Sequence, residues 1–351
     1  MMNRTIIVGI ASFGMSGKIF HAPLLTANKN FKIKRIVERT KNEAQTLYPA
    51  VIISRSFEEL LHDNEIELIV VNTPDQTHFD YAKKSLEAGK HVVVEKPFTQ
   101  TVEQGEELIN LAKKNRKLLS VFHNRRWDGD FLTVQRIVKK QMLGRLVDYE
   151  AHFDRYRNFI QTDSWKEQPA AGTDVVYNLG AHMIDQALVL FGMPTAVTAH
   201  LKIMRTGGAV NDWYDIRLHY PNVNVNLKTS LLVREQGPRY ILHGTHGSFL
   251  KWGIDPQEEA LKLGKNPNDP SWGKESKKWW GLLHIEKDTV QVREKYETLP
   301  GNYSSFYNNI FESIVHQKAL AVKPEGALDV IRIITSAQES SAQQKTIMMM
   351  S

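Results

Sequence analysis

A lysine at the end of a buried strand is the residue of this 351-residue chain best placed to do chemistry. The aliphatic run 91–94 is followed directly by Glu95, Lys96 and Pro97. Open α/β sheets bind ligands at the carboxyl ends of their strands, and a dry crevice disfavours a purely structural ammonium group. We therefore predict that Lys96 lies in a ligand-binding crevice and has more than a structural role. Pro97 would fix the following turn, and a cis peptide bond before it is one way to do so.

The segment Ser12 to Gly17 has the spacing of a dinucleotide-binding loop, with Ser12 in the place of the first glycine. It follows the first predicted strand and begins the first helix, so that Gly14 would admit a pyrophosphate and Gly17 would allow close packing. A generic strand–helix turn would explain the same residues. A P-loop is excluded, because Ile19 follows Lys18 and no glycine stands at Ser12. The residues predicted to bind the cofactor here are Ser12, Phe13, Gly14, Met15 and Gly17.

Glu38 and Arg39 end the second predicted strand, about twenty residues after the loop, where this fold places the residue that reads the ribose. A carboxylate there favours NAD, whereas an arginine can hold the 2′-phosphate of NADP. The pair leaves the choice between NAD and NADP open, and an ordinary charged strand end is the alternative interpretation.

Asn178 and His182 are four residues apart on a predicted helix and therefore share one face. A neutral imidazole near the positive end of a helix is suited to act as a base. Asn178 is also a candidate to cap this helix at its N-terminus. A single histidine on a helix is more often structural, so the residue needs further support.

The elements that position these residues change character near residue 122. Before it, buried apolar runs alternate with helices, which predicts a parallel, doubly wound sheet in a Rossmann domain over residues 1–122. Two capping boxes, Ser56 with Glu59 and Thr101 with Gln104, mark helix starts. The predicted strands are 5–11, 31–38, 68–72, 91–94 and 118–122.

The pattern of residues 123–351 predicts an α+β domain built on a large, mainly antiparallel open sheet, to which the family resemblance described below adds substrate binding and oligomerisation. Between 147 and 154 apolar and polar residues alternate, as in a strand with one face in water. The segment 264–280 is polar and is expected to be a surface excursion. Further strands are predicted at 197–203, 216–220, 224–233 and 239–243, and helices at 131–142, 178–191 and 327–344.

Composition excludes several classes of protein. The chain has no cysteine, which excludes disulfides, thiolate catalysis and Cys-based zinc sites, and we expect no metal. The net charge is +6, but Lys and Arg are interleaved with acidic residues along the chain and form no basic tract. Neither nucleic acid nor membrane is therefore an expected partner. The apolar run 6–11 is too short for a signal sequence, and the expected location is the cytoplasm.

These motifs together resemble the Gfo/Idh/MocA family of oxidoreductases over essentially the whole chain. The resemblance is greatest to its NADP-dependent scyllo-inositol dehydrogenase branch, through segments 17–24 and 122–127. The family motifs are Gly14 and Gly17, Thr73 to His78, Glu95 to Pro97, and Asn178 to His182.

The resemblance implies that NAD or NADP is held by the first domain and that substrate binds against the open sheet of the second. It adds Thr73, Pro74, His78, Glu95 and Lys96 to the cofactor-binding residues. It also implies a homodimer or homotetramer formed through the C-terminal sheet.

The same resemblance implies hydride transfer between the nicotinamide and a sugar or cyclitol alcohol, with Lys96 and His182 as catalytic residues. The usual aspartate is here Asn178, which can orient a hydroxyl but cannot take its proton; Ser12 and Asp75 are the other departures from the family pattern. Candidates for contacting the polyol substrate, each equally explained by packing, are His123, Asn124, Arg126, Trp127, Tyr156 and Trp165.

Two other functions fit the same residues. The chain could be a non-catalytic dinucleotide-binding regulator, to which Asn178 gives some weight although Lys96 and His182 argue against it. It could also be an NAD-dependent glycoside hydrolase, in which a transient oxidation allows elimination.

Overall fold

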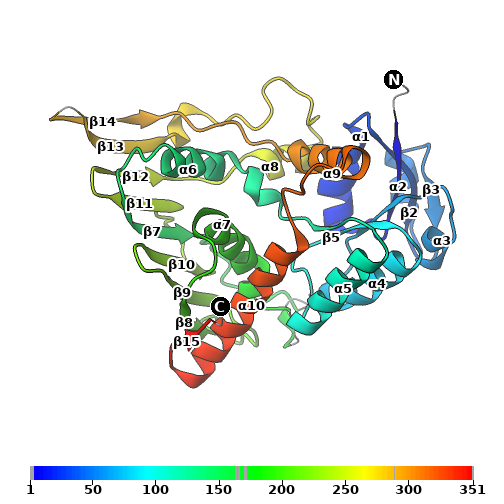
Figure 1. Ribbon diagram of the computed structural model, residues 1–351, viewed down its shortest axis with the longest axis horizontal. Coiled ribbons are helices and arrows are strands. Elements are labelled where there is room, and N and C mark those ends of the chain that lie inside the picture. The colour runs from blue at the N-terminus through cyan, green and yellow to red at the C-terminus, as the bar shows by residue number, and fades with distance from the viewer. Residues whose placement is uncertain (1–3, 163, 165–166, 170–171, 288, 350–351) are drawn as a thin grey trace. The chain divides into compact units, whose positions relative to one another are not determined.

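The computed structural model describes residues 4–162, 164, 167–169, 172–287 and 289–349, and divides into two compact units (Figure 1). The first unit comprises Met1–Trp127, Pro256–Trp272 and Asn302–Leu328. The second comprises Asp128–Asp255, Gly273–Gly301 and Asp329–Ser351. Two segments from later in the chain, 256–272 and 302–328, therefore belong to the first unit. The sequence prediction placed one boundary at residue 122 and did not include these segments in the first domain.

The first unit is built on a six-stranded, wholly parallel sheet, which confirms the predicted doubly wound architecture. Its order is β3-β2-β1-β4-β5-β6, so the connections change direction between β1 and β4. At such a switch point the loops that follow the two strands frame a ligand crevice. The strands are β1 Ile6–Ile10, β2 Phe31–Val37, β3 Ile52–Ser54, β4 Leu68–Val71, β5 His91–Val94 and β6 Leu119–Val121.

The central strands are apolar along their whole length because helices cover both faces of a parallel sheet. All four residues of β4 are buried, and so are three of the four in β5. The helices of this unit are α1 Ala22–Thr26, α2 Glu43–Leu47, α3 Glu58–Leu61, α4 His78–Glu87, α5 Val102–Lys114, α8 Gln257–Lys262 and α9 Ser304–His316. A π-helical turn, Gly17–His21, leads into α1, and 3₁₀ helices cover Asp75–Thr77 and Asn124–Trp127.

Of the two predicted capping boxes, the one at the start of α5 forms the hydrogen bond from the Gln104 amide to the Thr101 side chain. The Gln104 amide donates to Thr101 Oγ1 at 3.3 Å, while Gln104 Oε1 accepts from Gln100 N rather than from Thr101 N. In the other box, Glu59 accepts from the Ser56 amide at 3.2 Å. The prediction that Ser56 caps α3 is wrong, because the helix starts later, after Phe57, and has no side-chain cap.

The second unit is built on a nine-stranded sheet of order β14-β13-β12-β11-β7-β10-β9-β8-β15. Only β7 and β10 pair in parallel, which confirms a mainly antiparallel sheet among the described residues. Strands β12 to β15 are additions to the sequence prediction. The strands are β7 Leu146–His152, β8 Ala196–Lys202, β9 Trp213–His219, β10 Asn224–Ser230, β11 Tyr240–Gly244, β12 Gly247–Lys251, β13 Gly281–Lys287, β14 Val290–Tyr296 and β15 Ile347–Met348.

Helices α6 Gly129–Lys139, α7 Ala181–Phe191 and α10 Pro324–Gln343 lie on one face of this sheet (Figure 1). Ser340 of α10 accepts from the Ala199 amide of β8 at 2.9 Å. The alternation predicted for β7 is confirmed, since Tyr149 and Ala151 are buried while Glu150 and His152 are half-buried. None of the helices in the described part of the chain is long and apolar enough to cross a membrane.

Candidate functional site

The loop after β1 presents exposed backbone at the start of a helix. Gly14 and Met15 are exposed, Phe13 is buried, and the helical conformation begins at Met15. Ser12 Oγ accepts from the Gly14 amide at 3.2 Å, and Gly14 O accepts from Lys18 N at 2.9 Å. The serine that replaces the first glycine therefore closes the turn with its own side chain.

Gly17 is packed so closely that no other residue type fits at this position of the loop. A Cβ at Gly17 would lie 2.3 Å from Ser12 O and 2.8 Å from Asn72 Nδ2. Asn72, which is buried directly after β4, donates from Nδ2 to Ser12 O at 2.8 Å. It thus joins the loops that follow β1 and β4 at the switch point. The sequence prediction missed this role, although a polar residue ending an aliphatic run pointed to it.

Glu38 is committed to a helix cap. Its side chain is buried, Oε1 accepts from Glu43 N at 3.2 Å, and Oε2 accepts from Ala44 N at 2.8 Å. The amides of the first turn of a helix have no partner within the helix, so they stabilise a carboxylate placed at the N-terminus of α2. The neighbouring Arg39 is exposed. Of the predicted pair, only the arginine presents an exposed side chain.

The segment after β4 is held in place by His78. This residue is buried, with Nδ1 2.8 Å from Pro97 O and Nε2 3.0 Å from Thr73 O. It therefore connects the loops after β4 and β5, while Pro74 between them is exposed. The histidine supports the predicted cofactor-binding segment from inside.

Glu95, Lys96 and Pro97 follow β5 as predicted, and the Lys96–Pro97 peptide bond is cis. Lys96 is half-buried. Its amide donates to Glu95 Oε2 at 3.0 Å, and Glu95 Oε1 lies 3.1 Å from His21 Nε2. Burial acts to raise the pKa of Glu95, but the bond to His21 and the positive charge of Lys96 outweigh it and lower that pKa. The carboxylate beside the lysine is thus ionised.

His21 is fully buried and had no predicted role. Its Nδ1 lies 2.7 Å from the hydroxyl of Tyr307, which is on α9 and 286 residues away in the sequence. Burial raises the pKa of Tyr307 well above its ordinary value, so the phenol stays neutral. The structure thus joins Tyr307, His21 and Glu95 behind Lys96.

The helix that carries His182 begins earlier than predicted. A π-helical turn, Val176–Gly180, precedes α7, and Asp174 Oδ1 accepts from Val176 N and Tyr177 N, both at 3.0 Å. Asp174 is the N-cap, so the prediction that Asn178 caps the helix is wrong. His182 is buried and lies beyond the π-helical turn, so the placement of His182 at the positive helix end is also corrected.

The candidate substrate residues are divided between the units. His123 and Asn124 are buried in the first unit. In the same segment Arg126 Nη1 donates to Ala321 O at 2.6 Å, and the ring of Trp127 lies 6.0 Å from that of Phe306. Tyr156 belongs to the second unit and is 42% exposed; Trp165 lies outside the described residues.

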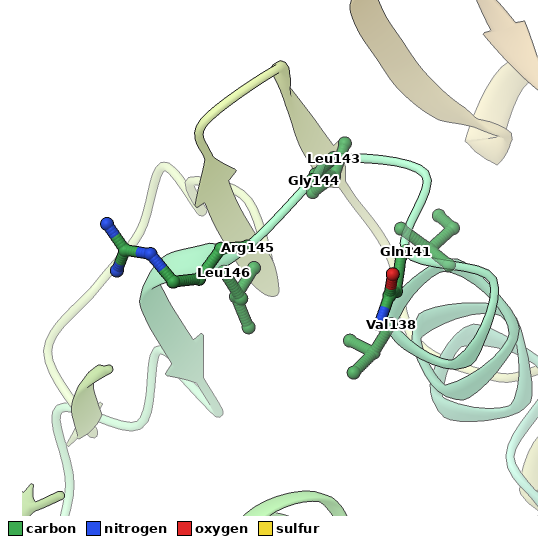
Figure 2. A pocket seen from close by; sticks show the side chains of 7 residues that line it. Val138, Gln141, Leu143, Gly144, Arg145 and Leu146 are labelled. Carbon is green, nitrogen blue, oxygen red and sulfur yellow. The ribbon is translucent and has the colours of Figure 1, made fainter. Parts of the chain in front are cut away.

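A surface pocket of about 340 Å³ lies in the second unit, between the end of α6 and the start of β7 (Figure 2). Its lining is mainly apolar and has one charged member, Arg145. None of the predicted site residues lines it, and a single arginine among aliphatic side chains supplies no acid–base pair. The pocket is not a candidate active site.

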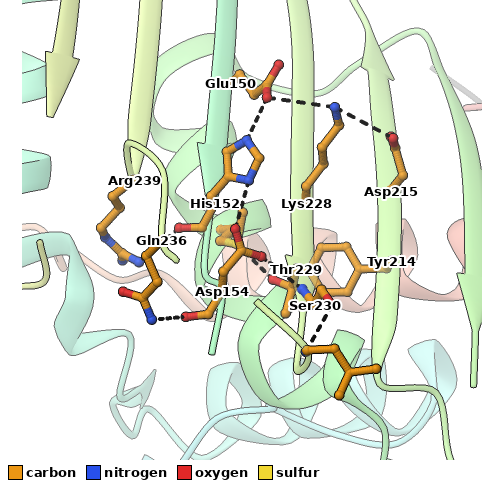
Figure 3. A network of polar contacts seen from close by, with 12 residues as sticks. Glu150, His152, Asp154, Tyr214, Asp215, Lys228, Thr229, Ser230, Gln236 and Arg239 are labelled. Carbon is orange, nitrogen blue, oxygen red and sulfur yellow. Dashed lines mark hydrogen bonds and ion pairs between the residues drawn. The ribbon is translucent and has the colours of Figure 1, made fainter. Parts of the chain in front are cut away.

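The face of the second sheet opposite its helices carries a polar network (Figure 3). His152 lies between Glu150 Oε1, 2.6 Å from its Nε2, and Asp154 Oδ2, 3.1 Å from its Nδ1. Lys228 is 3.7 Å from Glu150 and 3.9 Å from Asp215. Burial acts to lower the pKa of His152, but the two carboxylates outweigh it and raise that pKa.

Two family models match the chain, one for each part. Residues 4–123 match the oxidoreductase family model for the NAD-binding Rossmann fold, and residues 135–349 match its C-terminal alpha/beta domain. The chain is 40% identical to the scyllo-inositol 2-dehydrogenase (NADP(+)) IolW of Bacillus subtilis, over 98% of this chain and 96% of that protein. It is 38% identical to the uncharacterized oxidoreductase YdgJ of Escherichia coli, over 99% of each.

Solved structures agree with these matches. A protein of Bacteroides fragilis described as an oxidoreductase is 51% identical, with a TM-score of 0.92 over 99% of this chain and 100% of that one. YvaA of Bacillus subtilis is 39% identical, with a TM-score of 0.97 over 100% of each. The chain therefore belongs to the Gfo/Idh/MocA family and is an NAD(P)-dependent oxidoreductase.

Proposed function

We propose that the protein is an NADP-dependent dehydrogenase that acts on a CH–OH group of a cyclitol or sugar. One observation supports the proposal most strongly. Lys96 follows β5 and the Ser12–Gly17 loop follows β1 of the same parallel sheet, so both lie on the side of the sheet where the strands have their carboxyl ends. The name of the relative IolW supports an inositol-like substrate.

The first unit fits a dinucleotide. Exposed backbone at Gly14, a helix starting at Met15 and a switch point between β1 and β4 form the arrangement that receives a pyrophosphate. We infer NADP rather than NAD, because both oxygens of Glu38 accept from α2, whereas Arg39 is exposed and can pair with a 2′-phosphate. Thr73 and Pro74 after β4 complete the proposed cofactor site.

Bound NADP supplies the hydride acceptor at its nicotinamide, and the chain supplies proton transfer and charge stabilisation. In our proposal the Lys96 ammonium donates to the substrate oxygen and stabilises its developing negative charge. His182 takes the hydroxyl proton as a general base. Asn178 orients the hydroxyl without taking its proton. In the reverse direction His182 returns the proton to the oxygen.

We further propose that polar and aromatic side chains predicted from the sequence bind the substrate hydroxyls. The candidates remain His123, Asn124, Arg126, Trp127, Tyr156 and Trp165. Arg126 and Trp127 also pack within the first unit, so their substitution is expected to cost stability as well as affinity.

For assembly, we propose a homodimer or homotetramer formed through the face of the second sheet that carries His152 and Lys228. Family resemblance supports it, as does the row of half-buried polar side chains on that face (Figure 3). Light scattering of the purified chain, with and without charge reversal at Lys228, tests this directly.

A turnover screen tests the function. Inositols, other polyols and aldoses are offered with NADP and NAD separately, with a Lys96→Met variant as the control for contaminating dehydrogenases. The expected result is turnover of an inositol-like polyol with NADP. Tight cofactor binding without turnover of any polyol would instead indicate a regulator, and release of a free sugar from a glycoside would indicate a hydrolase.

A further inference from the structure

A chain of three hydrogen-bonded side chains, two of them fully buried, runs through the first unit to the residue next to Lys96. It consists of Tyr307 on α9, His21 in the π-helical turn before α1, and Glu95 at the end of β5. We propose that Tyr307 and His21 are positioning residues that hold the Glu95 carboxylate against the Lys96 backbone and so set the charge and reactivity of the Lys96 amine. This inference rests on the proposed function of Lys96.

Hydrogen bonds connect these three side chains to the Lys96 backbone. The Tyr307 hydroxyl lies 2.7 Å from His21 Nδ1, and either atom can carry the proton that they share. His21 Nε2–H donates to Glu95 Oε1 at 3.1 Å. The Lys96 amide donates to Glu95 Oε2 at 3.0 Å. Each carboxylate oxygen of Glu95 therefore accepts a hydrogen bond, Oε1 from His21 and Oε2 from the Lys96 amide.

Packing holds the rings of His21 and Tyr307 in this arrangement. The His21 ring lies 4.4 Å from that of Phe122, and the Tyr307 ring lies 5.6 Å from Phe31 and 5.3 Å from Phe306. His21 and Tyr307 are both fully buried. Rings enclosed in this way cannot leave their hydrogen bonds without opening the core.

A merely structural role does not account for the charge. A carboxylate whose side chain is only 12% exposed costs stability unless donors compensate it, and apolar side chains of similar volume would fill the same space at least as well. The groups that face Glu95 are His21 and Lys96, and Tyr307 stands behind His21. The compensated negative charge thus lies next to the lysine proposed to donate to the substrate.

Four variants and a control separate the roles. His21→Met removes the donor to Glu95, while His21→Gln keeps an N–H at the position of Nε2. Tyr307→Phe removes the hydroxyl, and Glu95→Gln removes the charge with little change of shape. The control is Tyr240→Phe, which deletes an equally buried hydroxyl that donates to Gln186 Oε1 at 2.8 Å in the second unit.

The first readout is the titration of the Lys96 amine, measured on the whole protein by competitive acetylation across pH and mass spectrometry. Loss of an adjacent negative charge should move the midpoint of labelling to lower pH by about one unit in Glu95→Gln. His21→Met should move it in the same direction, Tyr307→Phe by less, and His21→Gln should restore most of the shift. Tyr240→Phe should leave the midpoint unchanged.

The second readout is the pH profile of kcat with the substrate found in the screen. His21→Met should lower kcat by about tenfold with little change in KM, and should displace the profile by the shift seen in labelling. If His21→Met does not fold, Tyr307→Phe and Glu95→Gln carry the test. An unchanged Lys96 midpoint in folded Glu95→Gln and Tyr307→Phe would overturn the inference. A shifted midpoint in a protein that turns over no polyol would instead overturn only the proposed function.

Discussion

Glu38 Oε2 accepts a hydrogen bond from the Ala44 amide at 2.8 Å, so the carboxylate at the end of β2 caps α2. This relationship separates the two residues that the sequence left as rivals for the ribose. Arg39→Ala should lower kcat/KM with NADP by about 10- to 100-fold, equivalent to about 1.4–2.8 kcal/mol, and leave the value with NAD nearly unchanged. Steady-state kinetics with both cofactors check this. Equal losses with NADP and NAD would show that Arg39 does not contact the 2′-phosphate.

Glu38→Gln is the matched test of the cap. Because an amide accepts more weakly at a helix N-terminus, we expect a loss of about 1 kcal/mol in unfolding free energy and little change in cofactor preference. Urea unfolding gives the first quantity and the ratio of kcat/KM values gives the second. A large gain in NADP preference would place Glu38 at the ribose and refute its assignment as a cap.

Gly17→Ala should distort the nucleotide loop, because its Cβ would lie 2.3 Å from the Ser12 carbonyl. We expect a loss of about 1–3 kcal/mol in stability together with weaker cofactor binding. Gly14→Ala is the control, since its Cβ would meet only Ser12 Oγ at 3.4 Å. That variant should keep its melting temperature. Fluorescence titration with NADPH and thermal unfolding distinguish the two, and equal melting temperatures would disprove the packing argument.

His152 should make stability depend on pH in the neutral range. Its pKa in the folded protein is raised above the ordinary 6.5 by Glu150 and Asp154, after burial has acted to lower it. The stabilisation is therefore fully present below pH 6.5 and is lost as the pH rises through the folded pKa. Melting temperatures from pH 6 to about pH 9 should fall more steeply for the wild type than for His152→Asn. Parallel curves for the two proteins would rule out this contribution.

Asn178→Asp tests the departure from the family pattern. If an amide at this position only orients the hydroxyl, a carboxylate four residues before His182 should raise kcat or shift its pH profile. Initial rates from about pH 6 to pH 10, with Asn178→Ala beside them, check this. A variant identical to the wild type at every pH would mean that residue 178 does not approach the reacting oxygen.

Much of the fold could be predicted because buried strands produce local patterns of apolar residues in the sequence. The aliphatic runs gave β1, β4 and β5, and the alternation around Tyr149 gave β7 with its two faces. Strand β14 escaped because none of its seven residues is buried, so no apolar period marks it. The two returns of the chain to the first unit have no local pattern at all.

The candidate site divides in the same way. Lys96 and the Ser12–Gly17 loop could be predicted because each follows a buried strand that an aliphatic run marks in the sequence. The cis peptide bond before Pro97 involves only neighbouring residues and was also suggested by the sequence. The cap formed by Glu38 and the contact of His21 with Tyr307 depend on tertiary structure, the second across 286 residues. Such pairings need the topology, which residue types and spacing alone do not specify.

In the proposed mechanism Lys96 acts on the substrate oxygen of an NADP-dependent oxidation. The most direct measurement is kcat for Lys96→Met, taken together with the NADPH dissociation constant of the same variant. We predict that kcat falls by at least about 100-fold, the usual scale for an acid–base or oxyanion partner, while the dissociation constant changes little. Near-wild-type turnover by a folded Lys96→Met protein would remove Lys96 from the mechanism.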